Sequence, residues 1–305
     1  MHRYNLERRT FMDITLALGG GGARGAAHLG VLRVLEQEGF RIRAVAGTSI
    51  GAIVGALYAR LGSAAEVTRV IQLVDQSKLY GWPLADGPGL LGVRGVLDFL
   101  RQHLGEDTFD KLPIPCAAVA VDLNSNREIV LQQGRVVDAV MGSIAVPGLF
   151  PPKKYHEYTL IDGGTLDPVP VRAARALLPG LPVVAVSLMA PLDAPKTPLN
   201  VPLPVPEPLA QHIARLHITQ AVRIFVDAVD IGQRQMTELR LQLDRPEVLI
   251  RPNVTDINLL DRVDIPEIAR RGEEATRKSL PALRRAVSWQ ARTWRAVRRA
   301  VGGGA

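Results

Sequence analysis

The sequence predicts an α/β protein of three layers, α/β/α, in which a central and mostly parallel sheet lies between helices, with a helical C-terminal region. Three observations support this prediction. Strand-like apolar runs alternate with helical patterns between residues 13 and 61, several runs end in glycine-rich turns, and helical patterns dominate beyond residue 208. Strands that alternate with helices are typical of a parallel sheet covered by helices.

The first sixty residues establish the alternation. Residues 1–12 are expected to form a mobile tail, and Asp13 to Leu18 predicts a buried strand that runs into four consecutive glycines. From Arg24 onward, apolar residues recur at helical spacing until Gly39 closes the helix. Ile42 to Ala46 predicts a second strand, which leads through the sequence GTSIG into the helix former AIVGALYARL.

Later strands are bounded by turn residues. Residues 116–122 and 127–131 predict a hairpin around a polar turn. Tyr158 to Ile161 predicts a strand that ends at the sequence DGG, and Val183 to Leu188 predicts another. Residues 209–232 are expected to be helical, the sequence EVLIRP predicts the last strand, and the remainder is expected to be helical.

A proline-rich segment interrupts this pattern. Between Pro191 and Pro208 seven prolines occur in eighteen residues, which excludes a helix or a central strand. We expect this segment, 191–208, to be an extended surface part of one domain that spans residues 13–283. It would serve as a connector or as a mobile rim over an active site.

Composition limits the class of protein. The chain of 305 residues is 47% hydrophobic, enough for a sizeable core, without an apolar run that could span a bilayer. The single cysteine, Cys116, excludes an internal disulfide framework and a cysteine zinc cluster. The sequence MHRYNLERRTFMD lacks the apolar stretch of a secretory signal, so a cytoplasmic location is expected. The formal charge of +7 favours anionic partners, although no nucleic acid is expected and no oligomeric state is indicated.

The glycine loop allows two interpretations. Gly20, Gly22 and Gly25 form GxGxxG between a strand and a helix, as in a dinucleotide-binding turn. That fold also needs a carboxylate at the end of the second strand, where this chain has RAVAGTS instead. The Gly-Lys-Ser/Thr ending of a nucleoside-triphosphatase loop is missing as well. A cofactor is therefore not expected, and an oxyanion is the better ligand for this loop.

The sequence GTSIG follows the second strand and offers a nucleophile. Ser49 lies between Gly47 and Gly51, at a strand-to-helix turn that would lift the serine out of the sheet. Parallel strands bring this turn and the glycine loop to the same sheet edge. The backbone amides of the loop could then stabilise the negative oxygen of a tetrahedral intermediate.

A nucleophilic serine also needs a base. None of the six histidines lies in a motif typical of a catalytic triad, and His28 is expected to be a packed or capping residue. Asp162, in the sequence LIDGG at a strand end, is better placed. From the residues alone, it could equally be part of an ordinary Asp-Gly turn.

The sequences GGGGARG, GTSIG, SIAVPGLFPP and DGG, in this order, resemble the patatin-like phospholipase family and its compact bacterial members. The resemblance runs from Ile14 to about Leu283. It implies hydrolysis of lipid acyl esters by a serine–aspartate dyad, Ser49 and Asp162, with no cofactor and no metal. Asp167 departs from the asparagine often found in similar proteins. The loop that would form the oxyanion hole comprises Gly20, Gly21, Gly22, Ala23, Arg24 and Gly25.

Two expectations accompany this resemblance. Asp162 should be buried without a cationic partner, because burial would raise its pKa and make it a better base, so Arg24 should not pair with it. A non-enzymatic lipid- or protein-binding scaffold on the same fold is the alternative function, which the intact motif residues argue against.

The C-terminal stretch, residues 284–305, predicts a basic amphipathic helix with a glycine tail. Such a helix could contact an anionic membrane at the inner surface, or it could dock on the protein's own core. The predicted apolar face contains Leu283, Val287, Trp294, Val297 and Val301, and the basic face contains Arg284, Arg285, Arg292, Arg295 and Arg299.

Overall fold

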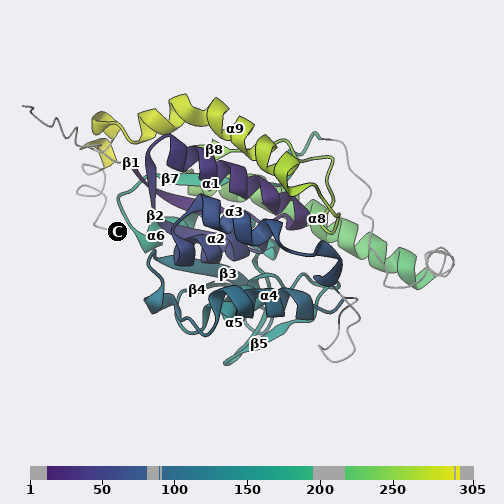
Figure 1. The fold of residues 1–305 in the computed structure, drawn as a ribbon. Coiled ribbons are helices and arrows are strands. Elements are labelled where there is room, and N and C mark those ends of the chain that lie inside the picture. The colour runs from purple at the N-terminus through teal and green to yellow at the C-terminus, as the bar shows by residue number, and fades with distance from the viewer. Residues whose placement is uncertain (1–11, 81–88, 90, 195–216, 292, 296–305) are drawn as a thin grey trace, which may run out of the picture.

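An eight-stranded sheet lies at the centre of the computed structural model, which describes residues 12–80, 89, 91–194, 217–291 and 293–295 (Figure 1). The strand order is β5-β6-β3-β2-β1-β7-β8, and β4 pairs with β3. The strands are β1 (Met12–Leu18), β2 (Phe40–Thr48), β3 (Cys116–Asp122), β4 (Arg127–Leu131), β5 (Lys153–Tyr155), β6 (Tyr158–Asp162), β7 (Val183–Val186) and β8 (Val248–Ile250).

The sheet is parallel in one part and antiparallel in the other. The pairings β1–β2, β1–β7, β2–β3 and β7–β8 are parallel, whereas β3–β4, β3–β6 and β5–β6 are antiparallel. The predicted hairpin of residues 116–122 and 127–131 is confirmed as β3 and β4. The predicted α/β fold with helices on both sides of a central sheet is likewise confirmed, and the sheet, expected to be mostly parallel, is mixed.

Helices cover both faces of the sheet. Figure 1 shows α1, α2, α3 and α9 crossing one face, where they enclose the larger core. A smaller core lies under α6 on the other face, which α8 also contacts. The helices are α1 (Ala27–Gln37), α2 (Ile50–Leu61), α3 (Ala64–Gln72), α4 (Arg94–Leu104), α5 (Val136–Ser143), α6 (Val171–Leu177), α8 (His217–Asp244) and α9 (Ile265–Ala286), with short 3-10 turns η1 (Gly22–Ala26), η2 (Gln76–Lys78), η3 (Phe109–Lys111) and η4 (Gly163–Thr165).

Side-chain alternation in β1 explains the two cores. Ile14, Leu16 and Leu18 belong to the larger core, and Ala17 belongs to the smaller one. Successive side chains of a strand point to opposite faces of the sheet, so this alternation buries both faces. The small side chain of Ala17 is matched by Ala46 on β2 in the same core, which lets α6 lie close to the sheet.

Two C-terminal helices extend beyond the boundaries predicted from the sequence. The predicted helix of residues 209–232 is present from His217, and it continues as α8 to Asp244; residues 209–216 lie outside the described part, as does most of segment 191–208. Helix α9 runs through the predicted boundary at residue 283 as far as Ala286. No helix in the described part has the length and apolar character needed to cross a bilayer.

Candidate active site

The strand ends that carry Ser49 and Asp162 meet along one edge of β3. In β3, Ala118 pairs with Leu131 of β4 and with Gly47 of β2, whereas Ala120 pairs with β4 and with Asp162 of β6. Since β4 occupies one edge of β3 from Ala118 to Asp122, β2 and β6 share the other edge. They approach head to head, β2 ending opposite Val119 and β6 ending opposite Ala120, so the residues at the two ends become neighbours.

Ser49 occupies a strained turn between β2 and α2. Its φ of 55° and ψ of −124° lie in a region that residues with a side chain rarely adopt. Gly51 makes the turn possible, because a Cβ there would lie 2.0 Å from the Leu18 carbonyl oxygen. The turn thus presents the Ser49 side chain beside the amino end of α2, where the helix dipole favours developing negative charge.

Asp162 is buried, and only one of its two carboxylate oxygens has a standard hydrogen bond among the described residues. Its Oδ1 accepts a hydrogen bond from the Gly164 N–H at 2.7 Å, and Oδ2 has no partner of standard hydrogen-bond geometry among the described residues. Burial raises the pKa of Asp162 to about 6, while hydrogen bonds from the Ser49 side chain and the Gly164 backbone oppose that rise. The Ser49 side chain therefore lies near this carboxylate, and among the described residues no cation contributes to the shift of its pKa.

The glycine loop packs directly on the serine turn. A Cβ at Gly20 would lie 3.3 Å from Ser49 Cβ, and one at Gly25 would clash with the Ile50 side chain. Gly22 has a φ of 56°, and a Cβ there would lie 2.1 Å from the Leu259 carbonyl oxygen. Only glycine fits this backbone at such close approach.

The loop amides differ in their availability. The N–H groups of Gly20 and Ala23 donate to the carbonyl oxygens of Pro168 and Leu259, at 3.0 and 2.9 Å. For Gly21 and Gly22, no acceptor is present in the described residues. The amides predicted to bind an oxyanion are those around Gly21, Gly22 and Ala23. Of these three, only the Gly21 and Gly22 amides lack an acceptor among the described residues.

Arg24 holds the loop and does not reach the dyad. Its buried side chain donates from Nε to the Ile257 carbonyl oxygen at 2.7 Å and from Nη1 to the Met189 sulfur at 3.9 Å. The bond to Ile257 attaches the glycine loop to the segment that follows β8, and the contact with Met189 attaches it to the residues that follow β7.

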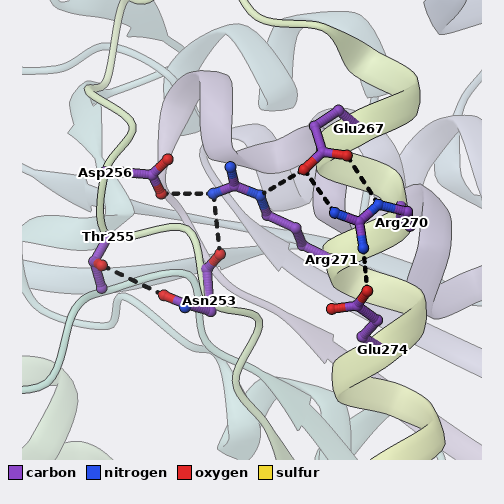
Figure 2. A network of polar contacts seen from close by, with 7 residues as sticks. All are labelled: Asn253, Thr255, Asp256, Glu267, Arg270, Arg271 and Glu274. Atoms are coloured by element: carbon purple, nitrogen blue, oxygen red, sulfur yellow. Dashed lines mark hydrogen bonds and ion pairs between the residues drawn. The ribbon is translucent and has the colours of Figure 1, made fainter.

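A polar network fixes that segment to α9 (Figure 2). Arg271 lies between the segment and the first turns of α9, 2.6 Å from Asp256 and 3.2 Å from Glu267, and it donates to the Asn253 carbonyl oxygen. Arg270 pairs with Glu267 and Glu274 on the same helix. Helix α9 therefore supports the loop that supplies the Leu259 and Ile257 carbonyl groups.

His28 is excluded as a base by its surroundings. It is fully buried on α1, and its Nε2 lies 2.9 Å from the Gly19 carbonyl oxygen. Burial lowers the pKa of His28 to about 4, so the ring is neutral at pH 7. No histidine of the described part lines either cavity beside Ser49.

Two groups of the sequence SIAVPGLFPP hold the backbones of Ser49 and Asp162, contacts that sequence reasoning missed. The Ser143 hydroxyl accepts the Ser49 N–H at 2.9 Å and donates to the Val119 carbonyl oxygen at 2.6 Å. The Ala145 carbonyl oxygen accepts the Asp162 N–H at 2.9 Å. Only the proximity of this segment to the DGG sequence in the chain could have suggested these contacts.

Asp167, where similar proteins often have asparagine, forms a buried ion pair behind the site. Its Oδ2 lies 2.9 Å from Nη2 of Arg240 on α8, which also contacts Glu128 at 2.7 Å. Burial raises the pKa of Asp167 to about 7. Because Thr48 donates to the Asp167 carbonyl oxygen at 2.8 Å, this ion pair joins α8 to the end of β2.

Two cavities adjoin Ser49 on different sides. The larger, about 580 Å³, is lined mainly by apolar side chains of α2, α4 and the segment before α9, among them Ile53, Val96 and Leu260. The smaller, about 50 Å³, contains Asp162 and is lined by polar residues of α8. No group of three or more His, Cys, Asp or Glu in the described residues could hold a metal ion.

The predicted C-terminal amphipathic face divides into two parts. Leu283 and Val287 are buried in the protein's own core, whereas Trp289 and Trp294 are 72% and 57% exposed. Val297, Val301, Arg292 and Arg299 lie outside the described residues. The first turn of the predicted 284–305 helix therefore docks on the protein, and the exposed tryptophans follow it.

Comparison with known proteins adds independent information. A family model described as "Patatin-like phospholipase" matches residues 16–175. Two NTE family proteins of Mycobacterium tuberculosis are 37% identical over 183 residues and 31% identical over 286 residues. These matches cover 57% and 88% of this chain, and 49% and 47% of the relatives. The chain thus spans about half the length of these curated relatives.

Two further matches are more limited. Lysophospholipase NTE1 of Mycosarcoma maydis is 36% identical over 175 residues, which is 54% of this chain and 9% of that protein. The crystal structure of VipD from Legionella pneumophila matches with a TM-score of 0.51 at 15% identity. It covers 88% of this chain and 66% of its own, a likeness of fold alone.

Proposed function

The chain belongs to the patatin-like phospholipase family, and from this membership we propose that it is a serine acyl-ester hydrolase acting on lipids. Ser49 is the nucleophile and Asp162 is the base. The likeness to a lysophospholipase supports a lipid substrate. The observation that carries the proposal is the head-to-head meeting of β2 and β6, which brings a strained serine and a buried carboxylate together.

The reaction proceeds in two halves. Ser49 Oγ attacks the ester carbonyl carbon while its proton passes to Asp162. The tetrahedral intermediate then collapses, the bond to the alcohol oxygen breaks, and Asp162 returns the proton to that oxygen. Water, deprotonated by Asp162, attacks the acyl-Ser49 ester, and the released serine oxygen regains its proton. No cofactor or metal is needed for these steps.

The pKa of Asp162 suits both of its roles. An aspartate of ordinary pKa, about 3.9, is a weak base at pH 7, whereas a pKa of about 6 leaves the group ionised and more basic. Among the described residues no cation lowers the pKa of Asp162, which preserves that basicity.

The glycine loop supplies the charge stabilisation. The Gly21 and Gly22 amides are the donors we propose for the oxyanion, since the Ala23 amide is already bonded to Leu259. One such donor typically contributes about 3 kcal/mol to stabilising the transition state. The acyl chain would occupy the apolar cavity of about 580 Å³.

Labelling with a fluorophosphonate tests this proposal, because such probes trap activated serines. The adduct should map by mass spectrometry to the peptide that contains Ser49, and Ser49→Ala should abolish it. Ser187, a buried serine outside both cavities, is an internal control and should stay unmodified. Folded protein without an adduct on Ser49 would contradict the proposal and favour the scaffold alternative.

A further inference from the structure

We propose that Arg234, on α8, binds the phosphate of the departing alcohol and so sets the preference for esters whose alcohol carries a phosphodiester over neutral esters. This inference rests on the proposed function and extends it, because it assigns a head-group subsite to the small polar cavity beside Asp162. That cavity is lined by α8 residues Asp227, Asp230, Gln233 and Arg234 and, from other parts of the chain, by Arg24 and Asn258.

The chemistry of the leaving group places the alcohol in this cavity. Asp162 must return a proton to the alcohol oxygen, so the alcohol has to leave on the Asp162 side of Ser49. Only the smaller of the two cavities contains Asp162, whereas the larger one is apolar and suits the acyl chain. The volume of about 50 Å³ holds a few water-sized groups, so it can take one compact polar group.

Arg234 has the properties of an anion-binding side chain. Its side chain is only 7% exposed, and its Nε lies 2.8 Å from Oδ2 of Asp230, one helical turn earlier. This ion pair fixes the orientation of the guanidinium. Among the described residues, neither Nη atom of Arg234 has a hydrogen-bond acceptor, and neither is fully shielded from solvent. A planar guanidinium with both Nη groups available is suited to phosphate.

Arg24 does not compete for this role, because its Nε and Nη1 are bonded to Ile257 and Met189. Asp230 attracts the Arg24 guanidinium and Arg234 repels it, so the three charges lie close together. Asp227 adds a second carboxylate. The cavity therefore has charges of both signs, as does a zwitterionic head group such as phosphocholine.

Two substrates with the same acyl chain test the assignment: palmitoyl lysophosphatidylcholine and monopalmitoylglycerol, each below its critical micelle concentration. The measured quantity is the ratio of the two kcat/KM values. Arg234→Gln should lower this ratio about 10- to 100-fold, the range for loss of a hydrogen bond to a charged group. Arg234→Lys should restore part of it. Arg172→Gln, which removes an exposed charge on α6, should keep the wild-type ratio.

The outcomes separate this inference from the proposed function. Active variants whose ratio stays within about twofold of wild type would show that Arg234 only packs α8, and would overturn the subsite alone. Fluorophosphonate labelling of each variant checks that the serine site is assembled. If Arg234→Gln does not fold, the ratio in Arg234→Lys decides. A wild type that is neither labelled nor active on either ester would overturn the proposed function, and the subsite with it.

Discussion

The Ser143 hydroxyl accepts the backbone N–H of Ser49 at 2.9 Å, across 94 positions of the chain. Ser143 is the last residue of α5 and is fully buried, and its own proton goes to the Val119 carbonyl oxygen. The backbone of the strained serine is thus tied to β3, the strand whose edge β2 and β6 share. Ser143 is a positioning residue, because it acts through the Ser49 backbone.

Ser143→Ala should therefore impair catalysis more than binding. It leaves the Ser49 N–H without its acceptor, which costs about 1–3 kcal/mol and loosens the turn. We expect kcat and the rate of fluorophosphonate labelling to fall about tenfold or more, with KM for a soluble ester nearly unchanged. Ser279→Ala, which removes a hydroxyl bonded within α9, is the control. A loss of thermal stability without a change in labelling rate would assign Ser143 a purely structural role.

The pH dependence of hydrolysis should report Asp162. The base must be ionised, so kcat/KM should rise about tenfold per pH unit below the pKa of about 6 and level off above it. Asp167, whose pKa is raised to about 7, lies behind the site, and Asp167→Asn should leave the midpoint in place. A midpoint near 4, or one that moves in Asp167→Asn, would assign the titration to another group.

Asp162→Asn should abolish hydrolysis and also stabilise the fold. The folded-state pKa is raised from 3.8 to about 6, so the folded protein binds the proton more tightly than the unfolded chain. Stability is therefore lost as the pH rises from about 4 to 6, up to about 3 kcal/mol. Asparagine avoids this loss, and urea unfolding at pH 4 and pH 7.5 should show its advantage only at the higher pH.

Ser49→Ala is the matched control for that experiment. It should be equally inactive yet still lose stability as the pH rises, because it retains the Asp162 carboxyl, and the missing Ser49 hydrogen bond should make that loss somewhat larger than in wild type. An Asp162→Asn protein with more than a few per cent of wild-type activity would refute the dyad. Equal stability of wild type and Asp162→Asn at both pH values would refute the assigned cause of the raised pKa.

The sequence was sufficient to predict that Ser49 and Asp162 lie in turns at strand ends, because the signals for these turns are local. Ser49 and Asp162 each follow a strand and adjoin glycines, and these turns depend on a few adjacent residues. The parallel part of the fold was predictable for the same reason, since strand and helix alternate in short order. The end of α9 at Ala286 was not predictable in this way, because the burial of Leu283 and Val287 depends on elements distant in the chain.

The supporting contacts were not predictable in the same way. Ser143 and Leu259 bond to the serine turn and the glycine loop from distant parts of the chain. Arg234 joins Arg24 at the small cavity because α8 packs on η4, the turn that directly follows β6. Sequence periodicity cannot show which distant carbonyl group an amide will bond. That the Ala23 amide is bonded to Leu259, whereas the Gly21 and Gly22 amides have no acceptor among the described residues, is therefore known only from the structure.

Val96→Phe should shorten the acyl chain that is accepted. Val96, on α4, is buried and lines the apolar cavity, so a phenyl ring there would occupy volume needed by a long chain. We expect kcat/KM for a palmitoyl ester to fall at least about tenfold relative to a butyryl ester. Val130→Phe on β4, outside the cavity, is the matched control and should not change this ratio. An unchanged ratio in Val96→Phe would mean that the chain lies elsewhere.

The exposed tryptophans support membrane contact away from the site. Gly30 and Gly272 pack α1 and α9 together, and both helices begin at the site. Trp289 and Trp294 follow the far end of α9, so contact there would leave the dyad remote from the bilayer. Replacing both with serine should lower sedimentation with anionic phosphatidylglycerol vesicles severalfold, while hydrolysis of a soluble ester persists.

Serine replacement is a cleaner test than removal of the C-terminal stretch. A truncation after Leu280 would also remove Leu283 and Val287, which are buried in the core, so lost binding could reflect unfolding. Leu73→Ser, at an exposed position next to α3, is the control for loss of one apolar side chain. Vesicle binding that survives in the double serine variant would assign membrane contact to another surface. Binding lost in Leu73→Ser as well would make the effect one of general surface hydrophobicity.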